Sequence, residues 1–144
     1  MKPSLQPGIE YRMTYEVQSD KVVEGLFGES ETLRQMPRVF ATGFLVGLLE
    51  WACVEAIKPH LDWPAEQSVG TRVEVTHEAP TPPGMEVLVT VEVLAVQGRR
   101  ISFQVEAHDG IDTIGRGTHE RVVIDAESFG ERAAQKLDGA GPSK

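Results

Sequence analysis

Residues 39–54 have the sequence VFATGFLVGLLEWACV, which is the most apolar segment of the chain. Phe44, Leu48 and Trp51 recur at helical spacing, and most of the remaining positions are small or apolar. A helix that is apolar on nearly every side is normally buried inside a protein or a membrane. The segment offers only about 14 residues before charged side chains resume, whereas a bilayer span needs about 20. We therefore predict a helix that is buried within the rest of the chain.

Glu50 is the one side chain between Ala41 and Val54 that is charged at neutral pH. Burying an unpaired carboxylate costs several kcal/mol or forces it to take up a proton. We expect Glu50 to point inward, where it either has a partner or lines a cavity in which an altered proton affinity is useful. The alternatives are that Glu50 marks the one solvated point of the helix or is neutralised by a buried arginine.

The 144 residues are sufficient for one domain with its own hydrophobic core. We expect the ordered core over residues 8–127 and a flexible tail over residues 130–144. The net charge of −8, with no basic cluster larger than a pair, argues against nucleic acid or an anionic membrane surface as a partner. The lone Cys53 and the absence of a signal-type segment after Met1 predict a cytoplasmic protein.

Five segments alternate between apolar and polar residues, as β-strands do. One precedes the helix at residues 8–17, and four follow it with hairpin-type turns between them, at residues 68–77, 86–93, 101–107 and 111–125. Within the last segment, Gly115 and Gly117 suggest a bulge or a close backbone approach. One buried helix with five antiparallel strands wrapped around it is the α+β arrangement called the hotdog fold. The two free edges of such a sheet predict a homodimer.

His77 ends the row Val69, Thr71, Val73 and Val75 on the strand face that we expect to pack against the helix. An inward His77 and an inward Glu50 could meet there, and a carboxylate beside an imidazole favours the charged form of both. The alternative is that His77 is a core histidine with satisfied hydrogen bonds.

Thr42 is placed to cap the N-terminus of the predicted helix. Because a helix rises about 1.5 Å per residue, Thr42 and Glu50 would stand roughly 12 Å apart on a straight helix. For both to act on one substrate, the start of the helix must bend or one residue must come from a partner subunit.

Other residues offer charge or backbone access near the helix. An inward Arg121 would bring positive charge to a site dominated by Glu50, although a solvated strand edge is an equal alternative. Gly70 would let a backbone amide approach a ligand. The chain has no glycine-rich phosphate loop, paired cysteines, HExxH or GxSxG. Its four histidines lack metal-ligand spacing, so we predict no metal site; they are His60, His77, His108 and His119.

Seven short motifs are specific enough to identify a relationship. They are VFATGF at 39–44, LLEWACV at 48–54, VTH at 75–77, TPPG at 81–84, GRR at 98–100, AHDG at 107–110 and GTHER at 117–121. Over about residues 8–125 the chain closely resembles the fluoroacetyl-CoA thioesterase family of hotdog enzymes. The resemblance implies a homodimer that hydrolyses acyl-CoA thioesters, with coenzyme A as part of the substrate and no separate cofactor.

The resemblance also implies roles for individual residues. The catalytic threonine, glutamate and histidine of the family fall on Thr42, Glu50 and His77. The glycine and arginine that such enzymes use around the acyl group fall on Gly70 and Arg121. Glu50 would attack the thioester carbonyl itself or deprotonate a water that does so, and the sequence leaves both routes open. His77 would orient groups and move protons, and Thr42 would stabilise the oxyanion.

Residues 18–38 are too poor in apolar residues for a core element and form either a flap over the site or a surface loop with a short helical turn. Family members that discriminate fluoroacetyl from acetyl groups have aromatic flap residues where this chain has Leu33 and Met36. With Val23 and Leu26, these would line a looser, slightly larger acyl pocket.

Two other functions are compatible with the same scaffold. A non-catalytic module that binds acyl-CoA or another small ligand would not need the set Thr42, Glu50 and His77. A hotdog hydratase would need an inward Asp/His pair at the start of the helix, which this sequence does not have. A short-chain acyl-CoA thioesterase is therefore the function that we predict.

Overall fold

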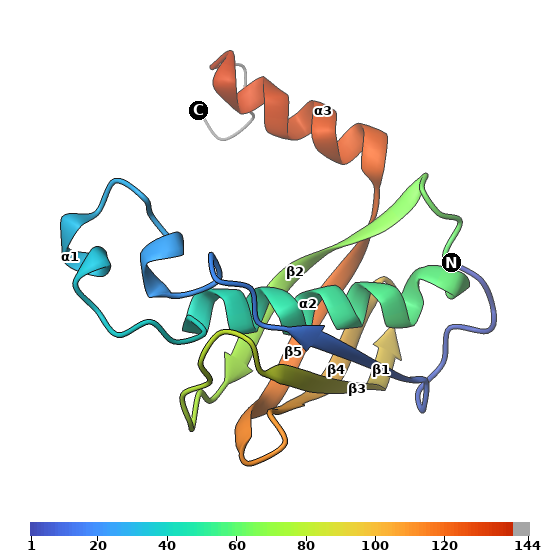
Figure 1. Cartoon of the computed structure of the whole chain (residues 1–144). Coiled ribbons are helices and arrows are strands. Elements are labelled where there is room, and N and C mark those ends of the chain that lie inside the picture. The colour runs from blue at the N-terminus through green and yellow to red at the C-terminus, as the bar shows by residue number, and fades with distance from the viewer. Residues whose placement is uncertain (140–144) are drawn as a thin grey trace.

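The computed structural model describes residues 1–139, in which a five-stranded antiparallel sheet wraps around the long helix α2, Thr42–Ile57 (Figure 1). The strand order is β1-β3-β4-β5-β2, so β1 and β2 form the two edges. The strands are β1 (Glu10–Glu16), β2 (Glu66–Val75), β3 (Glu86–Gln97), β4 (Arg100–His108) and β5 (Thr113–Asp125). The shorter elements are η1 (Val23–Gly25), α1 (Glu31–Arg34) and η2 (Lys58–His60), and α3 (Ala126–Leu137) follows β5. The predicted hotdog arrangement is confirmed.

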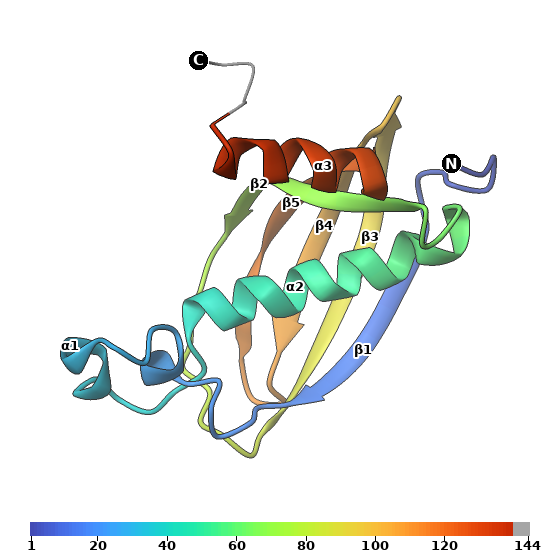
Figure 2. The same cartoon turned by 90° about the horizontal axis from the view of Figure 1, so that it is seen from above.

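The core lies between α2 and the concave face of the sheet, which curves around the helix in Figure 2. Alternate residues of β3 and β4 are fully buried there, as period-two patterning requires. Leu45, Leu49 and Ala52 of α2 face them and are also fully buried. Each buried large aliphatic side chain contributes about 1.5–3 kcal/mol relative to an exposed one. The buried apolar residues of β3 and β4 are Val87, Val89, Val91, Val93, Ile101, Phe103, Val105 and Ala107.

The opposite side of α2 remains open in the single chain. Trp51 is 49 % exposed, and Gly43 and Gly47 are also exposed. The expectation that the helix is covered on nearly every side is therefore met on one face only, because a single sheet can enclose only half of a helix. Within the part of the chain that the structure describes, no helix combines the length and apolar character needed to cross a membrane.

A β-bulge in β2 changes the face of the sheet to which its side chains point. The register with β5 shifts between Gly70 and Arg72, which leaves Thr71 as the extra residue. Gly70 pairs with the inward Arg121, and Val73 pairs with the inward His119. The predicted single row from Val69 to His77 is therefore wrong before the bulge, because one inserted residue moves the preceding side chains to the other face.

The glycines of β5 allow the close approach that we predicted. A Cβ on Gly115 would overlap the carbonyl oxygen of Thr76, and one on Gly117 would overlap that of Glu74. Glycine at both positions therefore lets the end of β2 pack tightly against β5.

The expected flexible tail is wrong for its first part, because α3 occupies Ala126–Leu137. The Asp125 side chain accepts a hydrogen bond from the Ser128 amide at 2.9 Å and caps this helix. None of the α3 residues is buried, and Figure 1 shows α3 apart from α2. The available sequence signal was Asp125 as a capping residue ahead of apolar residues at helical spacing. Residues 140–144 of the predicted tail lie outside the described residues.

Candidate active site

The start of α2 brings Thr42 and His77 into direct contact. Thr42 Oγ1 lies 2.7 Å from His77 Nδ1. Thr42 is the first helical residue and Ala41 occupies the N-cap position, so the predicted capping role of Thr42 is wrong. The hydroxyl is therefore engaged by the imidazole rather than by the amides of the first helical turn.

His77 carries the clearest sign of a missing partner. Its Nε2 is buried and has no hydrogen-bond partner among residues 1–139. A buried polar atom without a partner costs about 1–3 kcal/mol. Burial also lowers the pKa of His77, which favours a neutral ring that can accept a proton. The ring borders a cavity of 290 Å³ that Thr42 and Val23 also line.

Glu50 belongs to a second cluster. Arg121 Nη1 donates a hydrogen bond to Glu50 Oε1 at 3.1 Å, and His119 Nε2 lies 3.7 Å from the same oxygen. The Glu50 side chain is 40 % exposed, whereas Arg121 and His119 are buried. Glu50 therefore has the buried arginine partner that was one of the alternatives, and it also remains partly solvated. Its imidazole neighbour within the chain is His119 rather than His77.

Gly70, which we predicted to face a ligand, lies beside this second cluster. A Cβ at Gly70 would stand 2.6 Å from Glu50 Oε1 and 3.2 Å from His119 Cε1. No side chain fits in that space unless the carboxylate moves. Gly70, Glu50 and His119 line one cavity of 230 Å³.

The two clusters occupy different cavities in the single chain. The cavity at Thr42 and His77 shares no lining residue with the one at Glu50. Because α2 runs without interruption from Thr42 to Ile57, its eight-residue separation of Thr42 from Glu50 corresponds to about 12 Å. The predicted contact between Glu50 and His77 is therefore wrong within one chain.

The four residues that we predicted to line the acyl pocket from the flap lie in different places. Val23 lines the cavity at Thr42, and Leu26 packs over the start of α2, with its Cδ2 2.8 Å from the position of a Cβ on Gly43. Leu33 and Met36 belong to the lobe around α1 that projects beyond the start of α2 (Figures 1 and 2). Neither lines the cavity at Thr42 or the cavity at Glu50.

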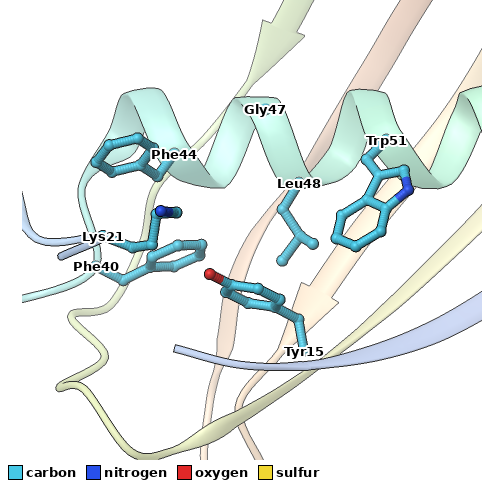
Figure 3. Close-up of a pocket in the computed structure, with 7 residues that line it drawn as sticks. All are labelled: Tyr15, Lys21, Phe40, Phe44, Gly47, Leu48 and Trp51. Carbon is cyan, nitrogen blue, oxygen red and sulfur yellow. The ribbon is translucent and has the colours of Figure 1, made fainter. Parts of the chain in front are cut away.

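A separate apolar pocket of 180 Å³ lies between α2 and β1 (Figure 3). The rings of Tyr15 and Trp51 meet edge to face there, with centroids 6.5 Å apart. Lys21 supplies its one cationic group, 5.5 Å from the Phe44 ring. Thr42, Glu50 and His77 do not line this pocket. The candidate site is therefore the region around these three reactive side chains, and the apolar pocket is not part of it.

Sequence reasoning did not select His119 and Ser68, which both contact Arg121. The position of His119 two residues before Arg121 on the same strand face was the available signal. Among the described residues, no three His, Cys, Asp or Glu side chains are grouped so as to hold a metal ion.

Residues 17–127 match the family model described as fluoroacetyl-CoA-specific thioesterase. The chain belongs to this family. The fluoroacetyl-CoA thioesterase of Streptantibioticus cattleyicolor is 50 % identical over 136 residues, which cover 94 % of this chain and 97 % of the relative. The resemblance that the motifs indicated is thus confirmed.

Solved structures agree with this assignment. A structure of the fluoroacetyl-CoA thioesterase FlK is 50 % identical, has a TM-score of 0.90, and is matched over 92 % of this chain and 98 % of that chain. A thioesterase superfamily member from Thermus thermophilus is 29 % identical, with a TM-score of 0.81 and coverage of 96 % and 99 %. The hotdog fold is shared by all of them.

Proposed function

We propose that the protein hydrolyses a short-chain acyl-CoA thioester to the free acid and CoA. The observation that carries this proposal is the Thr42–His77 pair with its unpartnered Nε2, in a chain half identical to a fluoroacetyl-CoA thioesterase. We further propose a cytoplasmic enzyme that needs no cofactor beyond the CoA of its substrate.

The proposal includes a homodimer whose site is shared between subunits. The support is that β2 is a free sheet edge within residues 1–139 and that both clusters lie along it. Antiparallel pairing of β2 with a second β2 sets the end of one strand, which His77 follows, beside the first half of the other, which holds Gly70. Thr42 and His77 of one subunit would then act with Glu50 of the other.

In this arrangement the Glu50 carboxylate is either the nucleophile or the general base. Glu50 either adds to the thioester carbonyl, which gives an anhydride and releases the CoA thiolate, or removes a proton from the water that attacks. Neutral His77 accepts and returns protons, and the Thr42 hydroxyl donates to the developing oxyanion. Arg121 holds the carboxylate in place through its hydrogen bond.

The acyl group is short in this proposal. A point mutant of FlK has been solved with fluoroacetate and CoA. This chain has the flexible aliphatic side chains Leu33 and Met36 in the flap, outside both cavities of the single chain, and they would tolerate acyl groups of different shape if the flap covers the bound substrate. We therefore expect activity on acetyl-, fluoroacetyl-, propionyl- and butyryl-CoA, with weak discrimination against the larger groups.

Thiol release, followed with a chromogenic disulfide reagent, tests the proposal with these four thioesters. Glu50→Gln keeps the shape of the side chain and removes its charge, so kcat falls by about 100-fold or more. Glu55→Gln removes a carboxylate from the same helix outside the cluster and serves as the matched control. Equal inactivity of the wild type on all four thioesters would instead support a binding module. Full activity of Glu50→Gln would refute the catalytic role of Glu50.

A further inference from the structure

The buried Arg121 has an almost complete set of partners. Its Nε donates to Ser68 Oγ at 2.8 Å, and its Nη2 donates to the Ser68 carbonyl at 2.9 Å. Its Nη1 lies 3.1 Å from Glu50 Oε1 and 3.0 Å from His119 Nε2. Nη1 carries two hydrogens, so each of these two contacts has its own donor.

The donors and acceptors in these contacts determine the protonation state of His119. A guanidinium only donates, so His119 Nε2 must accept and cannot carry a proton. On the other side of the ring, Nδ1 lies 2.7 Å from the Arg72 carbonyl oxygen, which only accepts. Nδ1 must therefore carry the proton. The two contacts together define a neutral imidazole with its hydrogen on Nδ1.

The surroundings hold the ring in this state. His119 is 4 % exposed and stacks on Phe103 of β4, with ring centroids 6.3 Å apart. Burial lowers the pKa of His119, and the charge of Arg121 acts in the same direction. The groups that act against this are the Arg72 carbonyl of β2, Glu50 of α2 and Glu120 of β5. A second proton on Nε2 would set two donors against each other at 3.0 Å.

We propose that His119 is a positioning residue, whose neutral Nδ1–H tautomer holds Nη1 of Arg121 against Glu50. The contacts with Ser68 fix the Nε and Nη2 side of the guanidinium, and His119 fixes the remaining side. Glu50 Oε1 then receives a hydrogen bond of set direction, while its Oε2 has no hydrogen-bond partner among residues 1–139. The kinetic part of this inference rests on the proposed thioesterase function, whereas the tautomer and the contact do not.

Two substitutions separate the acceptor from the bulk of the ring. His119→Phe keeps an aromatic ring on Phe103 and removes the acceptor, and His119→Gln returns an oxygen acceptor. We expect His119→Phe to lower kcat by about 10- to 100-fold, the range usual for groups that orient reactive side chains, with KM changed less than about threefold. His119→Gln recovers much of this loss. His60→Phe, far along the sequence, is the matched control.

A spectroscopic measurement tests the tautomer without any substrate. Two-bond proton–nitrogen correlation spectra of the 15N-labelled wild type should show His119 protonated on Nδ1 only, between pH 6 and 8. An Nε2–H or doubly protonated ring overturns the proposal, as does a folded His119→Phe with wild-type kcat. If both variants unfold, the wild-type spectrum still decides. If the wild type hydrolyses no thioester while the tautomer is as stated, the thioesterase function fails and the positioning contact stands.

Discussion

The shared site can be tested by combining two inactive chains in one dimer. Glu50→Gln removes the attacking group, and His77→Ala removes the proton acceptor. A general base must lie within about 2.6–3.2 Å of its target, or act through one water. The roughly 12 Å of helix between Thr42 and Glu50 is too long for both to meet one carbonyl from the same chain. A mixed dimer of the two variants would therefore contain one intact site and one doubly damaged site.

Co-expression with two different affinity tags and sequential purification gives the mixed dimer. Its kcat per dimer, measured by thiol release, should reach about half of the wild-type value, while each parent homodimer stays at least about 100-fold below it. Analytical ultracentrifugation checks that the species is a dimer. A mixed dimer as inactive as its parents would refute the reasoning, because it would show that Glu50 and His77 act from one chain.

Three further outcomes follow from single contacts. Gly70→Ala places a methyl group against Glu50 Oε1, so kcat should fall by about 10- to 100-fold without loss of the fold, as thiol release and circular dichroism would show. Asp109→Ala removes the acceptor of two backbone amides at 2.8 and 2.9 Å, and chemical denaturation should show a loss of about 2–4 kcal/mol; an unchanged midpoint would contradict this. Burial lowers the pKa of His77 and His119, so the unfolded chain binds protons to them at higher pH than the folded chain does. The stability that depends on the neutral rings is thus complete above about pH 6.5 and is lost below it, and Tm should be lower at pH 5.5 than at pH 7.5.

Local pattern was sufficient for the central helix and the five strands. The 3.6-residue recurrence of Phe44, Leu48 and Trp51 predicted α2, and alternation predicted the five strands, because both signals depend only on neighbours in the chain. The proximity of Arg121 to Glu50 was one of two alternatives that the strand pattern left open. The resemblance to a known family implied only that Gly70 and Arg121 lie around the acyl group. The capped helix α3 was missed, although Phe129, Ala133 and Leu137 recur at helical spacing after the N-cap residue Asp125.

The sequence by itself determined the list of reactive groups and the helix and strands that carry them. Only the tertiary structure decided which of these groups meet. The bulge at Thr71 turned Gly70 toward Glu50, and the close packing of β5 brought His119 and Arg121 to that carboxylate in place of His77. Periodicity assigns each side chain a face relative to its own element, whereas the contact between two elements depends on their register, which one extra residue changes.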